Sequence, residues 1–226
     1  MNSRKVVNMF FKTLFIGGAI GLLTSFVVKY QEYGNVIRPF DAMELFGILL
    51  FFAGMALVFT VISQTGFFAY LFIHRFGQNF FKSFWPTVQV LVILFALFDL
   101  IYFSYKAGEG NVSLLFYIIM TLVVLGCGII VGRMKVRQTN RTGFIPALFV
   151  MVVVTALELS LVLRVGDMDY IILMLTPLLA ANGYQVLALH EVTKRDEEHI
   201  KRIEERRKRR KMQKKKAAEK KYAKQS

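Results

Sequence analysis

The sequence predicts an all-α, polytopic membrane protein with six transmembrane helices and a basic cytoplasmic C-terminal helix. Three observations lead to this prediction. The 226 residues are 55% hydrophobic, more than in ordinary soluble domains. Six stretches are apolar over the ~20 residues that a helix needs to cross a bilayer. Residues 190–226 hold 16 of the 29 Lys and Arg against 7 Asp and Glu. We therefore divide the chain into a six-span transmembrane domain, residues 1–190, and a charged, strongly basic cytoplasmic tail, residues 191–226.

The first two spans are expected at residues 11–28 and 45–73. Basic residues precede the first span, as in a signal peptide, but no convincing cleavage site of small residues follows it, so we interpret it as an anchor. The second stretch would form a helix of about 44 Å, too short for two spans and a turn. We expect one tilted or kinked helix, with Gly66 as the place for a bend.

The chain after the second span is rich in aromatic residues. We expect Gln64 and Thr65 to mark the transition to the cytoplasmic headgroups, with the following aromatics at the interface. Residues 76–86 then read as an amphipathic loop lying on the membrane. Its rings either anchor the loop in lipid or offer a docking surface for a protein partner. The candidate partner-binding residues are Phe76, Phe80, Phe81, Phe84 and Trp85.

The remaining spans are expected at residues 86–105, 112–131, 143–163 and 170–189, and three polar residues in them are candidate functional groups: Asp99, Glu158 and Asn182. Intramembrane carboxylates are costly and often functional. Asp99 and Glu158 each lie about 9 Å from the outer end of their helix, so structural pairing, sensing and transport all remain open. Asn182 lies near Pro177 in the last span, which we expect to be less regular and to line an interior polar patch.

Small residues recur at intervals of four in two of the spans. This spacing lets two helices approach closely, either within one chain or between two chains, and we favour packing within the chain. The single cysteine, Cys127, is interpreted as a small packing residue. The candidate helix-packing residues are Gly17, Gly21, Gly128 and Gly132.

The distribution of Lys and Arg predicts the orientation, because cytoplasmic loops are enriched in them. With the N-terminus inside, nine basic residues before the tail fall on the inner side and four on the outer side. The inner residues are Arg4, Lys5, Lys12, Arg75, Lys82, Arg133, Lys135, Arg137 and Arg141. The outer residues are Lys29, Arg38, Lys106 and Arg164. We therefore expect both termini in the cytoplasm.

The tail predicts a charged helix followed by a polybasic run. Five Glu residues precede a Lys or Arg by four positions, which is the favourable order on a helix. The run RRKRRKMQKKK would be attracted to anionic lipid of the inner leaflet, with protein contact as an alternative. No interleaving of aromatic and basic residues supports a specific nucleic-acid site. The candidate anionic-lipid contacts are Arg206, Arg207, Lys208, Arg209, Arg210 and Lys211.

Catalytic and metal-binding motifs are absent from the sequence. The stretch HEVTK has Lys194 where a zinc protease would need its second histidine. Neither a phosphate-binding loop, a nucleophile elbow nor a dinucleotide fingerprint occurs. We therefore expect neither an enzyme nor a cofactor.

Two runs, ISQTGFFAYLFIHRFG and FWPTVQVLVILFALFDLIYF, resemble the KinB-signalling-pathway activation proteins of endospore-forming bacteria, and FFKTLFIGGAIGLLTSF is similar as well. The resemblance extends over about residues 5–190 and is most specific at residues 63–77. It implies a multi-pass protein of the bacterial cell membrane, needed for a sensor histidine kinase to feed the sporulation phosphorelay. It carries over no catalytic residue.

The predicted function is thus a non-catalytic regulator that favours the active state of a membrane histidine kinase, its expected partner besides the lipid bilayer. Two other classes stay open. A small ion or solute transporter would use Asp99 and Glu158, and a membrane-biogenesis factor would use the tail to bind lipid or ribosomes. Many transporters contain inverted repeats. We find no internal similarity between residues 1–110 and 111–190, which favours the regulator.

Overall fold

The computed structural model describes residues 3–37, 40–107, 112–163, 167–190 and 205–206, and its regular structure is helical throughout these ranges. A helix over Met168–His190 follows the labelled elements. The labelled elements are α1 (Ser3–Val28), α2 (Tyr30–Ile37), α3 (Ala42–Phe81), η1 (Lys82–Phe84), α4 (Trp85–Ala107), α5 (Leu114–Gln138), η2 (Arg141–Gly143), α6 (Phe144–Phe149), η3 (Val150–Val154) and α7 (Thr155–Leu163).

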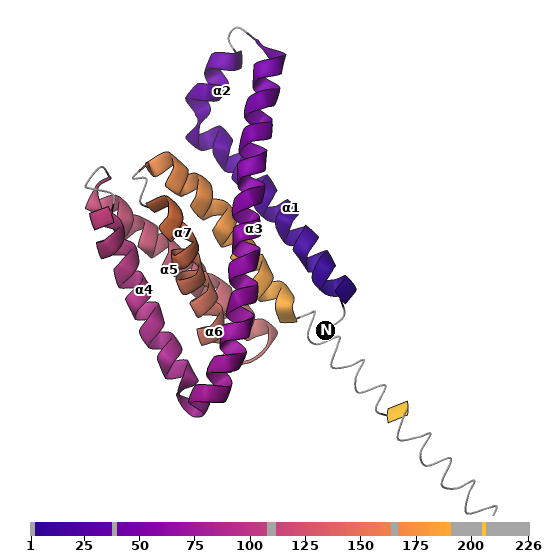
Figure 1. Ribbon diagram of the computed structural model, residues 1–226, viewed down its shortest axis with the longest axis vertical. Helices are drawn as coiled ribbons and strands as arrows, with labels where there is room; N and C mark the ends of the chain where they lie inside the picture. Colours follow the sequence, from indigo (N-terminus) through magenta and orange to yellow (C-terminus); the bar gives the residue numbers. More distant parts are fainter. Residues whose placement is uncertain (1–2, 38–39, 108–111, 164–166, 191–204, 207–226) are drawn as a thin grey trace, which may run out of the picture.

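Successive long segments run in opposite directions (Figure 1). The first reversal passes through α2, and α4 and α7 end on the same side of the bundle, which we call the α2 end. The chain turns back between α3 and α4 at the opposite end, which we call the η1 end. The turn from α5 into α6 also lies at the η1 end. The bundle is thus built from α1, α3, α4, α5, the continuous segment α6–η3–α7, and the helix Met168–His190.

Among the described residues, five helical stretches are long and apolar enough to cross a membrane. One of them, Ala42–Lys106, has 65 residues and contains both α3 and α4, because η1 joins these helices without a non-helical gap. The chain reverses at Lys82, the C-cap of α3, which has a positive φ of 48°. The prediction of an amphipathic loop over residues 76–86 is therefore wrong: α3 continues to Phe81, and α4 begins at Trp85. Pro86 fits the first turn of α4, where its missing N–H is not needed.

The element bounds differ from the predicted spans in two instructive ways. Helix α3 has 40 residues, about 60 Å of helix, because it extends in both directions beyond the apolar run. It is uninterrupted at Gly66, and the helix Met168–His190 is likewise uninterrupted at Pro177. Helix α2 was not predicted, although its buried residues Tyr33 and Val36 have helical spacing. Tyr33 packs with Phe52 of α3 and Leu173 in a small separate core.

The four glycines predicted to pack helices all lie at close helix contacts. A Cβ on Gly17 would overlap Thr60, and one on Gly21 would overlap Ala56, so both glycines bring α1 against α3. On α5, a Cβ at Gly128 would lie 2.9 Å from Leu148, and one at Gly132 would lie 2.9 Å from Phe144. Their absent side chains let α5 pack closely against α6, as small residues do in helix pairs.

Candidate functional site

A cluster of buried polar side chains joins α3, α7 and the helix Met168–His190. We call Ser63, Thr155, Glu158 and Asn182 the polar cluster; none is more than 6% exposed. The Asn182 amide nitrogen donates to Thr155 Oγ1 at 3.1 Å and to Glu158 Oε2 at 3.0 Å. Ser63 Oγ donates to Asn182 Oδ1 at 3.0 Å. Asn182 therefore connects three separate segments of the bundle.

Glu158 lies directly against the backbone of α3. A Cβ on Gly66 would overlap Glu158 Oε1, so the carboxyl group occupies the space that a side chain would take. Among the described residues, Glu158 Oε1 has no hydrogen-bond partner. Leaving a buried polar atom unpaired is costly. The carboxyl group is thus held by one amide and by the shape of its surroundings.

Asp99, the other predicted intramembrane carboxylate, does not belong to the polar cluster. It lies half-buried on α4 next to Phe98, which is 52% exposed. Its backbone carbonyl accepts from Ser104 Oγ at 3.3 Å. Asp99 and Glu158 share no hydrogen-bond partner among the described residues, so the structure does not bring the two carboxylates into one site.

Two members of the polar cluster, Ser63 and Thr155, are not among the predicted site residues. A hydroxyl within an apolar span commonly marks a helix contact, and this is the signal that indicates them. Gln64 was expected at the headgroups, but it is 2% exposed. Its amide nitrogen donates to the Phe10 carbonyl at 2.9 Å. Gln64 therefore links α3 to the start of α1 inside the bundle, and its expected level at the cytoplasmic headgroups stays a prediction.

The α3–α4 turn presents a group of exposed rings at the η1 end. We call Phe76, Phe80, Phe81, Phe84 and Trp85 the aromatic corner. Phe80 and Phe84 are the most exposed, at 84% and 71%. Trp85 is only 6% exposed, and its ring lies where a Cβ on Gly77 would be. Trp85 therefore supports the corner from inside, and it is not part of the exposed surface that the sequence predicted.

A hydrogen-bond network between α3 and α4 supports the aromatic corner. Trp85 Nε1 donates to His74 Nδ1 at 3.0 Å. Tyr70 Oη lies 3.2 Å from the same nitrogen and accepts from Gln89 Nε2 at 3.3 Å. The Tyr70 ring contacts the Phe149 ring of α6, with centroids 5.3 Å apart. Tyr70 and His74 are four residues apart, a spacing that places both on one face of α3.

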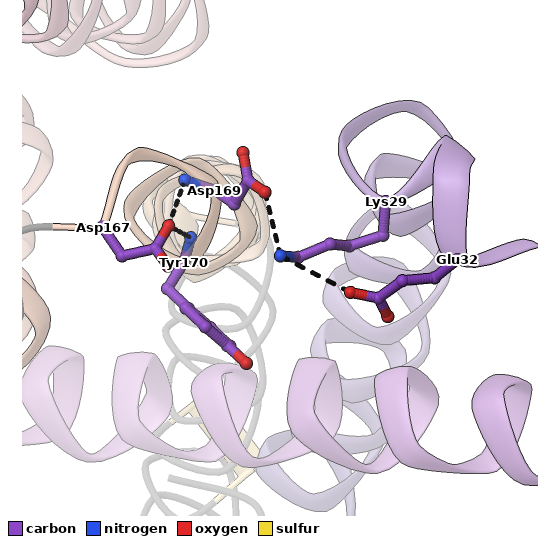
Figure 2. Close-up of polar contacts among 5 residues, drawn as sticks. All are labelled: Lys29, Glu32, Asp167, Asp169 and Tyr170. Carbon is purple, nitrogen blue, oxygen red and sulfur yellow. Dashed lines mark hydrogen bonds and ion pairs between the residues drawn. The ribbon is translucent and has the colours of Figure 1, made fainter.

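An ionic contact closes the α2 end of the bundle (Figure 2). Lys29 Nζ lies 2.8 Å from an Asp169 oxygen and 3.7 Å from Glu32, and 5.1 Å from the centroid of the Tyr170 ring. Asp167 Oδ1 accepts from the backbone N–H of Asp169 at 2.9 Å. The hydrogen bond to Asp169 raises the pKa of Lys29 above its ordinary value, despite the opposing effect of burial. The link between α1 and α2 is thus tied to the start of the helix Met168–His190.

The tail lies almost entirely outside the described residues. Arg206 is described, in a helical and exposed conformation, whereas the candidate lipid contacts Arg207, Lys208, Arg209, Arg210 and Lys211 fall outside the described ranges. Within those ranges, no group of three or more His, Cys, Asp or Glu residues could hold a metal ion.

Comparisons with known proteins cover most of the chain. The family model described as KinB-signalling pathway activation in sporulation matches residues 17–192. The KinB-signaling pathway activation protein of Bacillus subtilis (strain 168) is 40% identical over 192 residues, which are 84% of this chain and 97% of that relative. No solved structure matches the chain significantly. The polar cluster and the aromatic corner lie within the matched range, and the polybasic run lies beyond it.

Proposed function

Because the chain belongs to the family of KinB-signalling pathway activation in sporulation, we propose that it is a non-catalytic integral membrane regulator that activates a sensor histidine kinase. The proposal has three parts: the bundle spans the bacterial cell membrane six times, both termini lie in the cytoplasm, and the aromatic corner contacts the kinase.

The membrane part is supported by the apolar surface of the helices. Large hydrophobic side chains stay exposed along α1, α3, α4 and α5; examples are Phe15 at 78% and Phe95 at 63%. Soluble proteins rarely expose apolar surface of this extent. Hydrocarbon around the bundle would cover these side chains. The alternation of α1, α3, α4, α5, α6–η3–α7 and Met168–His190 then gives six crossings.

The orientation is supported by the charges at the two ends of the bundle. The described acidic residues of the links at the α2 end are Glu32, Asp41, Glu44, Asp167 and Asp169. The turns at the η1 end carry Arg75, Lys82, Arg133, Arg137 and Arg141, and no acidic residue among the described positions. Basic residues accumulate on the cytoplasmic side of membrane proteins, so the η1 end faces the cytoplasm.

The single observation that carries the kinase contact is the exposed, rigidly supported aromatic corner. Phe80 and Phe84 project from a turn that the His74–Trp85 hydrogen bond holds in place. Exposed aromatic side chains on a preorganised support are typical of binding hot spots, and a rigid support lowers the entropy lost on binding. At the cytoplasmic membrane surface, the corner is positioned to contact the membrane-proximal part of a kinase.

Activation then follows from preferential binding. A regulator raises the active population of a kinase only if it binds the active conformation more tightly than the inactive one. A tenfold preference corresponds to about 1.4 kcal/mol. A few aromatic contacts that form only in the active conformation supply a difference of this size.

The test replaces Phe80 and Phe84 by Ala in a Bacillus subtilis strain in which this chain substitutes for its 40% identical relative. We expect KinB-dependent sporulation output to fall at least about tenfold, with unchanged protein level, because the loss of two ring contacts removes more than ~1.4 kcal/mol. The matched control is Phe95→Ala with Phe98→Ala, which removes two exposed rings of α4, 63% and 52% exposed, away from the corner.

Photo-crosslinking distinguishes direct from indirect action. A photoreactive residue at position 80 or 84 should capture the kinase, and one at position 95 should not. Full output from the Phe80/Phe84 variant, or equal kinase capture from all three positions, would rule out the corner as the contact surface.

A further inference from the structure

Three arginines converge at the turn from α5 to α6. A cleft of about 390 Å³ is lined by Arg133, Val136, Arg137, Arg141 and Phe144. Arg133 and Arg137 lie one helical turn apart on α5, and such pairs share one face of a helix. The short turn through η2 brings Arg141 back beside them.

The fold itself holds this turn in place. The backbone N–H of Thr139 ends α5 by donating to the Lys135 carbonyl at 3.0 Å. The backbone N–H of Gly143 donates to the Asn140 carbonyl at 3.1 Å. Phe144 packs on Gly132, which places its ring in the wall of the cleft. The position of Arg141 therefore follows from the packing of α6 on α5.

The three arginines line the cleft, and no carboxylate of the described residues lines it with them. Like charges at a spacing of four residues repel each other on a helix, so this arrangement costs free energy unless an anion joins it. Lys135 does not contribute to the cleft, because its Nζ donates to the Val186 carbonyl at 2.6 Å. Arg133, Arg137 and Arg141 therefore line the cleft, whereas Lys135 in the same turn does not.

We propose that this cleft binds the phosphate group of an anionic phospholipid. Guanidinium groups match phosphate oxygens through paired hydrogen bonds, and the half-buried Val136 and Phe144 offer apolar contact to the start of an acyl chain. The cleft lies at the end of α5, an apolar helix long enough to span a membrane. A lipid headgroup at the bilayer surface would lie at the same level. The site is separate from the tail and does not depend on kinase contact.

Native mass spectrometry of the full-length chain in detergent tests the proposal. We expect the chain to retain phosphatidylglycerol and not phosphatidylcholine. The triple variant R133Q/R137Q/R141Q should bind phosphatidylglycerol roughly 100-fold more weakly, because each basic side chain near an anionic surface contributes about a factor of five. The triple lysine variant R133K/R137K/R141K keeps the charge, and we expect an intermediate loss from its missing paired hydrogen bonds.

The matched control removes three exposed positive charges outside the cleft, as R75Q/K82Q/K106Q, and should retain the lipid as the unchanged chain does. Equal retention by R133Q/R137Q/R141Q and the unchanged chain would overturn the proposal, as would an equal loss of the lipid in the R75Q/K82Q/K106Q variant. Glycerol phosphate added with the lipid separates the two phosphate sources. Displacement of the lipid by an equal concentration of glycerol phosphate would assign the cleft to a soluble phosphate and overturn the lipid assignment.

Discussion

Gly66 and Glu158 are matched in shape. The carboxyl group of Glu158 fills the space that a side chain at Gly66 would occupy. Asn182 complements this contact by donating to Glu158 and Thr155 while accepting from Ser63. Single atoms at these positions therefore determine how closely α3, α7 and the helix Met168–His190 approach. Two substitutions test these contacts separately.

Replacing Gly66 by Ala should destabilise the bundle by roughly 1–3 kcal/mol, the usual cost of overpacking a close contact. Gly54→Ala in the same helix is the matched control, because nothing lies within 4 Å of its Cβ position. The control should be neutral or slightly stabilising, since glycine disfavours a helix interior. Thermal unfolding of the purified chain in detergent measures both. Equal stability of the two variants would show that α7 can move away from α3 without a loss of stability.

Replacing Asn182 by Ala removes three hydrogen bonds, and replacing Ser63 by Ala removes one of them. Hydrogen bonds between membrane helices contribute about 0.6 kcal/mol each on average. We therefore expect Asn182→Ala to cost roughly 2 kcal/mol and Ser63→Ala less than ~1 kcal/mol in the same unfolding assay. A larger loss for Ser63→Ala would contradict the central position of Asn182.

At the level of elements, the sequence predicted the helical segments well, because an apolar run of about 20 residues in so hydrophobic a chain strongly favours a spanning helix. The prediction failed where contacts with other parts of the chain determine the local structure. Residues 76–86 are predicted to form a loop on the membrane surface, yet α3 continues to Phe81. Trp85 was expected on the surface, but its indole N–H pairs with His74 and its ring fills the space beside Gly77.

The candidate sites also include residues that the sequence could predict and residues that it could not. The sequence selected Glu158 and Asn182 because polar residues stand out in apolar spans, and the structure brings them together. It could not show that Asp99 lies outside the polar cluster, because the sequence does not show which side chains of different helices meet. The predicted spans place Arg133, Arg137 and Arg141 in one connection, but their meeting around one cleft depends on the tight turn at η2, which no local pattern indicates.

Replacing Gly77 by Ala tests how the α3–α4 turn is assembled. The added methyl group would overlap the ring of Trp85, so the ring must leave its buried position. Trp85 is the single tryptophan of the chain, and its fluorescence should become more accessible to a soluble quencher. Gly126→Ala on α5, where nothing lies within 4 Å, should leave quenching unchanged. Equal quenching in both variants would show that the turn is not built around Gly77.

At the scale of the whole molecule, the bundle is fastened differently at its two ends. The α2 end is closed by the ionic contact of Lys29 with Asp169, which joins segments far apart in sequence. The η1 end has exposed rings and arginines with no acidic residue among the described positions of its turns. The described structure is thus tied together at one end and exposes aromatic rings and arginines at the other.

Replacing Lys29 by Gln should lower the free energy of unfolding by about 0.5–1 kcal/mol, as for a partly exposed ion pair. The pKa of Lys29 is raised above 10.5 in the folded chain. Its contribution is therefore fully present below pH 10.5 and is lost only as the pH rises through the raised value. The difference between the unchanged chain and the Lys29→Gln variant should stay constant from about pH 7 to 9. Unfolding at several pH values checks this, and a difference that shrinks within that range would contradict the assignment.

Helix α3 also fixes a rotational phase between the polar cluster and the aromatic corner. Each residue of a helix advances the chain by 1.5 Å and about 100°. One residue inserted between Tyr70 and His74 would turn Phe80 by more than a quarter of a revolution relative to Ser63. An insertion of seven residues would nearly restore the angle, since it completes close to two turns, but would move the corner about 10 Å along the axis. The number of residues from Ser63 to Phe81 is therefore a structural constant of this chain, and members of its family with the same two features should keep that length.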